Sequence, residues 1–114
     1  MTMQLKTRKV DIVNVVDING KITLGEGNVI LRDTIRNLLA RGEKKILLNL
    51  GDVTYIDSSG IGELVSSFTT TTNQGGQLKL LNLTKKVQDL LQITKLLTVF
   101  EVFTNEAEAL QSYK

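Results

Sequence analysis

Residues 45–62 of the chain read KILLNLGDVTYIDSSGIG, and they join an apolar run to the beginning of an amphipathic pattern. The apolar run at residues 45–50 is short and rich in leucine and isoleucine, as is typical of a buried strand. The pattern after it has apolar residues at positions i, i+3, i+4 and i+7, namely Ile61, Leu64, Val65 and Phe68. This spacing predicts a helix with one buried face, so the whole stretch predicts a strand that leads into a helix.

The junction between this strand and helix is polar, with Asp57, Ser58 and Ser59 in a row. All three are common N-cap residues, because their side-chain oxygens accept hydrogen bonds from the free N–H groups of a first helical turn. A serine at such a position faces solvent, and the positive end of the helix stabilises a phosphate placed there. By residue type alone, such a triplet is more often a plain helix cap than a phosphorylation site. In both cases the junction predicts an accessible hydroxyl on a rigid corner.

The N-terminal part of the chain predicts an antiparallel hairpin. Residues 10–18 are rich in β-branched side chains, which favour a strand. Asn19 and Gly20 form a dipeptide that is typical of a two-residue hairpin turn, and residues 21–24 are expected to form the returning strand. We therefore expect the first two strands to pair antiparallel at the edge of a sheet.

The rest of the chain alternates helix-like and strand-like segments. Asn28 is expected to cap a first helix that Gly42 ends. The second helix is expected to fray at residues 69–72, because four consecutive threonines form helices poorly. Thr84 and Asn105 are expected to cap two further helices. Two more strands are predicted at residues 78–83 and 97–103.

This order of elements predicts an α/β fold for residues 1–114 as a single domain. Strands that alternate with helices form parallel neighbours joined by right-handed crossovers. We expect a mixed, mostly parallel sheet of four to five strands, with the N-terminal antiparallel hairpin and about four helices. Ligands of such sheets bind at the carboxyl ends of the strands, and the Ser58 corner follows such an end.

Composition excludes several classes of function. The 114 residues include no cysteine and carry a formal charge of +2, with no aromatic residues interleaved among the lysines and arginines. Direct nucleic-acid binding is therefore not expected. No apolar run approaches the about 20 residues that span a bilayer, so we expect no membrane insertion and a cytoplasmic location.

Catalytic and metal sites are also disfavoured by the sequence. The chain has no histidine, which excludes a Ser-His-Asp triad and histidine-ligated zinc. A Ser-Lys dyad is formally possible, but no lysine lies near Ser58 in sequence. Asp52 and Asp57 could be read as paired carboxylates or magnesium ligands, although a turn residue and a helix cap are the simpler interpretation. We expect no enzyme activity, no cofactor and no metal.

Residues 46–62 resemble the core signature of the STAS family, the anti-sigma factor antagonists. The resemblance continues through residues 75–80, 90–96 and 100–103 and ends with a helix-like segment at residues 105–113. It implies the family's fold over nearly the whole chain. It also implies a bacterial, cytoplasmic signalling protein that regulates transcription through protein–protein contacts, as a monomer or a weak homodimer.

The resemblance assigns roles to the polar corner. In the phosphorylated branch of the family, the serine directly after the aspartate is modified, which corresponds to Ser58, with Ser59 as the second choice. The implied partner-binding residues are Asp57, Ser58, Ser59, Gly60, Ile61 and Gly62. Gly60 and Gly62 are expected to keep bulk away from the hydroxyl, so that a kinase can approach the backbone.

The implied partners are an anti-sigma factor with serine kinase activity and a serine phosphatase. The unphosphorylated domain would bind the anti-sigma factor and release a sigma factor, and phosphorylation would end that binding. Two alternatives remain open. The domain could be a non-phosphorylated structural subunit of a membrane-transport or other signalling assembly, or Ser58 could be the nucleophile of a small hydrolase.

Overall fold

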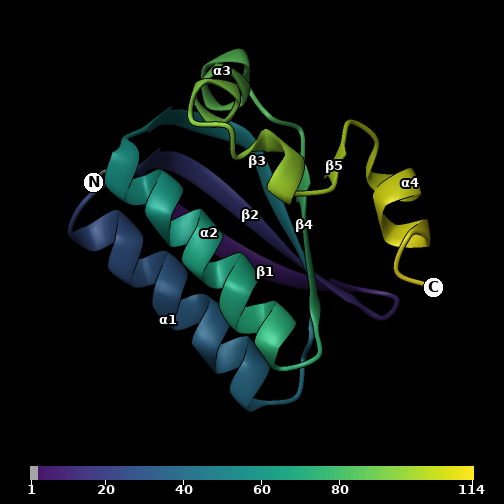
Figure 1. Cartoon of the computed structure of the whole chain (residues 1–114). Coiled ribbons are helices and arrows are strands. Elements are labelled where there is room, and N and C mark those ends of the chain that lie inside the picture. The colour runs from purple at the N-terminus through teal and green to yellow at the C-terminus, as the bar shows by residue number, and fades with distance from the viewer. Residues whose placement is uncertain (1–2) are drawn as a thin grey trace.

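The computed structural model describes residues 3–114 as one five-stranded sheet with helices on both faces (Figure 1). The strands are β1 (Met3–Val10), β2 (Val13–Ile22), β3 (Lys45–Ile56), β4 (Gln77–Leu81) and β5 (Val102–Phe103). The helices are α1 (Glu26–Ala40), α2 (Ser58–Asn73), α3 (Lys85–Ile93), the short 3-10 helix η1 (Leu97–Val99) and α4 (Glu106–Gln111). The strand order is β1-β2-β3-β4-β5, antiparallel between β1 and β2 and parallel elsewhere. The predicted fold class is therefore confirmed.

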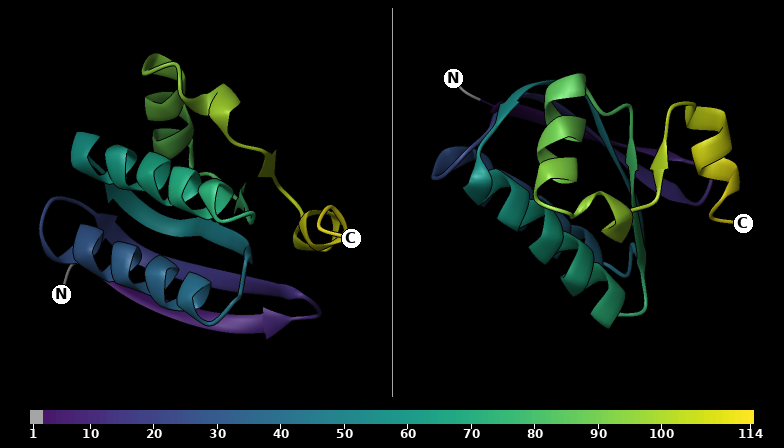
Figure 2. Two further views of the ribbon diagram at one scale, coloured as in Figure 1. Left: turned by 60° about the horizontal axis from the view of Figure 1, so that its bottom comes forward. Right: turned by 45° about the horizontal axis from the view of Figure 1, so that its top comes forward.

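The helices cover the two faces of the sheet unequally. Helices α1 and α2 lie side by side along one face (Figure 1, Figure 2), and α3 packs on the same face through Val87 and Leu91. Within residues 3–114, only α4 and the residues after it cover the other face, where Ala109 and Tyr113 belong to a smaller apolar core with Val13 of β2. The main core consists mostly of leucine, isoleucine and valine side chains, together with Met3 and Phe100. The parallel strands β2, β3 and β4 end at the same edge, and the loops at that edge precede α1, α2 and α3.

The N-terminal hairpin exists, but its predicted position is wrong. The turn lies at residues 11–12, with Asp11 at a φ of 58°, and β1 begins as early as Met3. Asn19 and Gly20 lie inside β2, where Gly20 pairs with Met3 across the hairpin. Gly20 has a φ of 105° and lies at a register shift between β2 and β3. The dipeptide therefore provides an irregularity within a long strand, because the pairing with β1 and β3 outweighs its local turn preference.

The first helix begins earlier than predicted. Gly25 occupies the N-cap position without a side-chain hydrogen bond, and Asn28 is a buried residue inside α1. Gly27 lies against β2, where an added Cβ would be 2.8 Å from the Lys21 carbonyl oxygen. The close packing of this first turn on β2 therefore sets where the helix starts. The predicted end is confirmed, because Gly42 has a φ of 80° directly after the C-cap residue Arg41.

Strand β3 and helix α2 are longer than predicted. The strand continues six residues beyond Leu50 to Ile56, so Asp52 lies in a strand and not in a turn. Pairing with β2 up to Ile56 supports this extension. The helix continues through all four threonines to Asn73, and Thr71 donates a hydrogen bond to the Ser67 carbonyl oxygen at 2.8 Å. Tertiary packing thus outweighs the low helix propensity of threonine.

The predicted last strand at residues 97–103 is mostly not a strand. Residues Leu97–Val99 form a 3-10 turn, and only Val102–Phe103 pair with β4. Phe100 explains the break, because its ring is buried in the main core. It packs edge to face on the Phe68 ring, with 5.3 Å between the two ring centres. The helix caps predicted at Thr84 and Asn105 are confirmed, since their side chains accept hydrogen bonds from Val87 N–H and Glu108 N–H.

Candidate functional site

Asp57 holds together the corner between β3 and α2. It has an extended backbone and is the N-cap residue of α2. One carboxylate oxygen accepts a hydrogen bond from the Gly60 N–H at 2.8 Å, as predicted for a cap. The other oxygen accepts from the Leu24 N–H at 3.3 Å, in the loop between β2 and α1. A single side chain therefore fixes two loops at the carboxyl end of the sheet.

Ser58 is the first residue of α2 and is exposed. Its hydroxyl forms no hydrogen bond with any residue from 3 to 114, so it is free for another molecule. Ser59 follows it and is partly buried. The hydroxyl of Ser58 lies at the positive end of a 16-residue helix, where free N–H groups and the helix dipole favour an anion.

The two residues after the serines support the corner from below. Gly60 is buried, and an added Cβ would lie 2.1 Å from the Ile22 carbonyl oxygen. Ile61 is 4% exposed and belongs to the main core. Gly62 is exposed and has open space around its Cα. Of the two glycines expected to leave room for a partner, only Gly62 faces outward, because Gly60 is needed for the close contact between α2 and β2.

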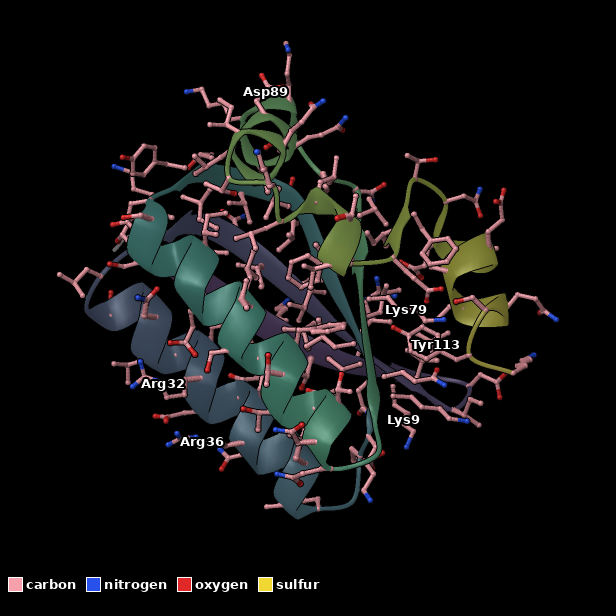
Figure 3. The ribbon with its side chains drawn as sticks, viewed as in Figure 1. Lys9, Arg32, Arg36, Lys79, Asp89 and Tyr113 are labelled. Atoms are coloured by element: carbon pink, nitrogen blue, oxygen red, sulfur yellow. The ribbon has the colours of Figure 1, made fainter. Side chains whose placement is uncertain are left out.

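A hollow of about 630 Å³ opens beside Ser58, between the end of β3 and α3. The residues that line it are Tyr55, Ile56, Asp57, Ser58, Lys86, Asp89, Leu90 and Ile93. The four that come from α3 are spaced i, i+3, i+4 and i+7, so they form one stripe of that helix. Asp89, labelled on α3 in Figure 3, accepts a hydrogen bond from the Lys85 ammonium at 3.0 Å.

Exposed apolar side chains surround the corner. Leu24 is 78% exposed and Ile93 is 76% exposed, while Tyr55 is about half exposed. Leu24 is tied to Asp57 through its backbone, and the other two line the hollow with Ser58. A cluster of large apolar side chains left in solvent is typical of a protein-binding surface, whereas isolated ones are common everywhere. The sequence patterns did not identify these residues, because they come from three separate segments.

A buried acid behind the corner was also missed. Glu63 on α2 is only 7% exposed, and its carboxylate receives two hydrogen bonds from the Arg32 guanidinium on α1, the shorter at 2.8 Å. This pairing raises the pKa of Arg32 above its usual value. Arg32 is labelled in Figure 3 on the outer side of α1. The ion pair joins the two helices and helps to fix the orientation of α2, on which Ser58 lies.

Among the described residues, the corner lacks the contacts of the catalytic and metal sites considered above. Within residues 3–114, no lysine forms a hydrogen bond with Ser58, and no group of three or more acidic side chains is arranged to hold a metal ion. Asp52 and Asp57, considered above as a carboxylate pair, have different surroundings, since Asp57 is used for capping and Asp52 lies on an exposed part of β3. None of the helices in the described part of the chain has the length and apolar character needed to cross a membrane.

Comparison with known proteins identifies the family. The sequence model of the STAS domain matches residues 4–109. The chain belongs to the STAS domain family. The Bacillus subtilis (strain 168) protein named anti-sigma-B factor antagonist is 36% identical over 87 residues, which are 76% of this chain and 78% of that relative. The anti-sigma F factor antagonist of Paenibacillus polymyxa is 22% identical over 110 residues, covering 96% and 94%.

Solved structures of other proteins share this architecture. A crystal structure from Thermotoga maritima superposes with a TM-score of 0.87 at 26% identity, covering 95% of this chain and 92% of that one. The phosphorylated form of the Bacillus cell fate determinant SpoIIAA superposes with a TM-score of 0.77 at 19% identity, covering 97% and 100%. The second likeness concerns the fold alone. The family resemblance seen in residues 46–62 is thus confirmed by the match over residues 4–109.

Proposed function

We propose that this STAS protein is an anti-sigma factor antagonist that binds an anti-sigma factor with serine kinase activity and is switched off by phosphorylation at Ser58. The observation that carries the proposal is the free, exposed hydroxyl of Ser58 at the start of α2, surrounded by exposed apolar side chains. The names of the two curated relatives support the same role.

The apolar surroundings of Ser58 give the unphosphorylated protein its affinity. Burying Leu24 and Ile93, each about three quarters exposed, contributes roughly 25 cal/mol per Å² of apolar surface removed from water. A neutral hydroxyl at the centre of such a contact costs little to cover when it finds one hydrogen-bond partner. The partner surface is therefore expected to be mostly apolar, with a polar group opposite Ser58.

Phosphorylation reverses this balance without unfolding the domain. A phosphoserine adds about −1.5 to −2 charges and three strong acceptor oxygens at the centre of the contact. Covering that charge with an apolar partner surface is costly. The N-terminus of α2 stabilises the phosphate within the domain itself. The fold is retained and the interface is lost, which is the requirement for a reversible switch.

A reversible switch at Ser58 requires a kinase that adds the phosphate and a phosphatase that removes it. The kinase transfers the γ-phosphoryl group of ATP to the Ser58 oxygen, and a serine phosphatase restores the hydroxyl. The antagonist itself performs no chemistry and acts as a binding protein in the cytoplasm. Asp57, Ser59 and Gly62 would lie at the edge of the contact, whereas Gly60 and Ile61 act through the position of α2.

Phosphorylation with purified components tests the proposal. The wild-type protein is incubated with Mg-ATP and each serine kinase of the anti-sigma type encoded in the same genome, and the product is analysed by mass spectrometry. We expect one phosphate, which is lost in Ser58→Ala and retained in Ser59→Ala. Label that persists in Ser58→Ala and disappears in Ser59→Ala would assign the modification to the other hydroxyl.

The transport alternative gives a different result in the same experiment. A structural subunit of a transport assembly needs no kinase, so every candidate kinase would fail to bind or label the wild-type protein. A complex between the wild-type protein and an anti-sigma factor, measured by calorimetry, would support the proposal independently of the labelling.

A further inference from the structure

One stripe of α3 faces the hydroxyl of Ser58 across the hollow described above. Lys86, Asp89, Leu90 and Ile93 form this stripe, and Ser58 lies on the opposite wall with Asp57. Leu90 and Ile93 make part of the stripe apolar. Lys86 and Asp89 add one positive and one negative side chain, so the local charge depends on what each of these two contacts.

The two charged side chains of the stripe are not equivalent. Asp89 is paired with the ammonium group of Lys85, one turn before it on the outer side of α3. Lys86 forms no ion pair or hydrogen bond with another side chain in residues 3–114. The Asp57 carboxylate is already shared between the N–H groups of Gly60 and Leu24. Lys86 is therefore the one charged group lining the hollow that has no protein partner among the described residues.

We propose that Lys86 is the cationic partner of the phosphate group when Ser58 is phosphorylated. This inference rests on the proposed function, because it concerns the modified form of the same corner. The ammonium group of a lysine is a compact charge on a flexible four-carbon stem, which allows it to move toward a new anion without any backbone change. The phosphate would then be held between the N-terminus of α2 and the side chain of Lys86.

The contact has a consequence for the phosphate itself. An opposite charge beside a phosphate favours its more highly charged form, so Lys86 would stabilise the dianion.

Lys21 is the competing candidate. It lies near the end of β2, is exposed, and pairs in register with Tyr55, which also lines the hollow. Lys21 itself does not line the hollow. It therefore provides a matched comparison of equal charge on a neighbouring element. Lys44 provides a second comparison, since it precedes β3 at the opposite end of the same strand from Ser58.

The test uses protein with phosphoserine incorporated at position 58 during translation, so that no kinase is needed. The pKa of the phosphate is measured by ³¹P NMR titration in the otherwise wild-type protein and in Lys86→Gln, Lys86→Arg, Lys21→Gln and Lys44→Gln. Because an opposite charge favours the dianion, we expect Lys86→Gln to raise the pKa by about 0.2–0.7 pH units. Lys86→Arg should keep the wild-type value, and Lys44→Gln should change it by less than Lys86→Gln.

Each result separates the inference from its rivals. Equal pKa values in Lys86→Gln and the wild type would overturn it, and so would a larger rise in Lys21→Gln, which would assign the phosphate contact to β2. Far-ultraviolet circular dichroism of each variant confirms that the fold is retained. Failure of every kinase to label Ser58 would contradict the proposed function and leave this measurement unaffected.

Discussion

The Ser58 corner and the C-terminal end of the chain use polar groups in opposite ways. At the C-terminal end, Lys79, Glu101, Ser112 and Tyr113 form a cluster that we call the C-terminal clamp. The Lys79 ammonium donates hydrogen bonds to the Ser112 carbonyl and hydroxyl oxygens at 3.1 and 2.9 Å and pairs with Glu101 at 2.9 Å. Its charge also lies 4.6 Å from the centre of the Tyr113 ring.

The Tyr113 hydroxyl completes the clamp by donating a hydrogen bond to the Ile46 carbonyl oxygen. Figure 3 shows Lys79 and Tyr113 next to each other beside α4. The side chain of Lys79 is only 9% exposed, although it carries a charge. Such burial is tolerated because each of its contacts compensates for lost water. The clamp therefore fixes α4 on the sheet and leaves little for another molecule to bind.

The corner shows the reverse arrangement. The Ser58 hydroxyl has no partner in the described chain, and Leu24 and Ile93 remain in water. Stability would be served better by covering these side chains. The clamp pairs its polar groups within the domain, whereas the Ser58 corner leaves a hydroxyl unpaired, among the described residues, beside exposed apolar side chains. The first arrangement serves stability, and the second is typical of a protein-binding surface.

Breaking the clamp should have the largest effect on stability. Tyr113→Ala removes a 3% exposed ring from the smaller core and its contact with Lys79, so we expect a loss of about 3–5 kcal/mol in the free energy of unfolding. Urea denaturation measures it. Partner binding by the folded fraction should be unchanged. Wild-type stability in Tyr113→Ala would show that α4 contributes little to the fold.

Alkaline pH should weaken the clamp in a smaller and reversible way. Burial raises the pKa of the Tyr113 hydroxyl above its usual value. The folded form therefore holds this proton more tightly than the unfolded form, and the resulting stability is present below about pH 10 and declines as the pH rises above it. Urea midpoints between about pH 9 and 11 should fall less steeply in Tyr113→Phe. If the urea midpoints of the wild type and Tyr113→Phe fall in parallel with pH, the Tyr113 hydroxyl is not the group responsible for the pH dependence.

The cap at the corner should matter less for stability and more for binding. Asp57→Ala removes the hydrogen bond to Gly60 and the tie to Leu24, and we expect a loss of about 1 kcal/mol. Binding to the anti-sigma factor should weaken beyond this stability change, because Leu24 loses its position. Urea denaturation of Asp57→Ala measures its stability loss, and calorimetry of the same protein measures its loss of affinity for the anti-sigma factor. Asp57→Asn retains an acceptor oxygen for one of the two N–H groups and should lie between Asp57→Ala and the wild type.

The smallest stability effect is expected from a charge at Ser58. Ser58→Asp places a carboxylate at the N-terminus of α2, where it should be neutral or stabilising by about 0.3–1 kcal/mol. Anti-sigma factor affinity should nevertheless fall. Ser59→Asp, at the neighbouring and partly buried position, is the matched variant. A well-folded Ser58→Asp protein with wild-type affinity would remove charge as the cause of the switch.

The sequence by itself determined the features that depend on neighbouring residues. The strand-to-helix junction, the Asp57, Thr84 and Asn105 caps and the end of α1 at Gly42 follow from local hydrogen bonding and from the spacing of apolar residues. The family signature in residues 46–62 also lies within this local stretch. These features were correctly predicted because each of them is decided within about one or two helical turns.

Only the tertiary structure decided the features that join distant segments. The turn preference of Asn19 and Gly20 was outweighed by pairing with strands on both sides, and the cap expected at Asn28 was displaced by packing of α1 on β2. The Leu24 N–H reaches Asp57 across 33 positions of sequence, and Lys86 reaches the hollow from α3. No local pattern contains such contacts, because burial and strand pairing are properties of the whole sheet.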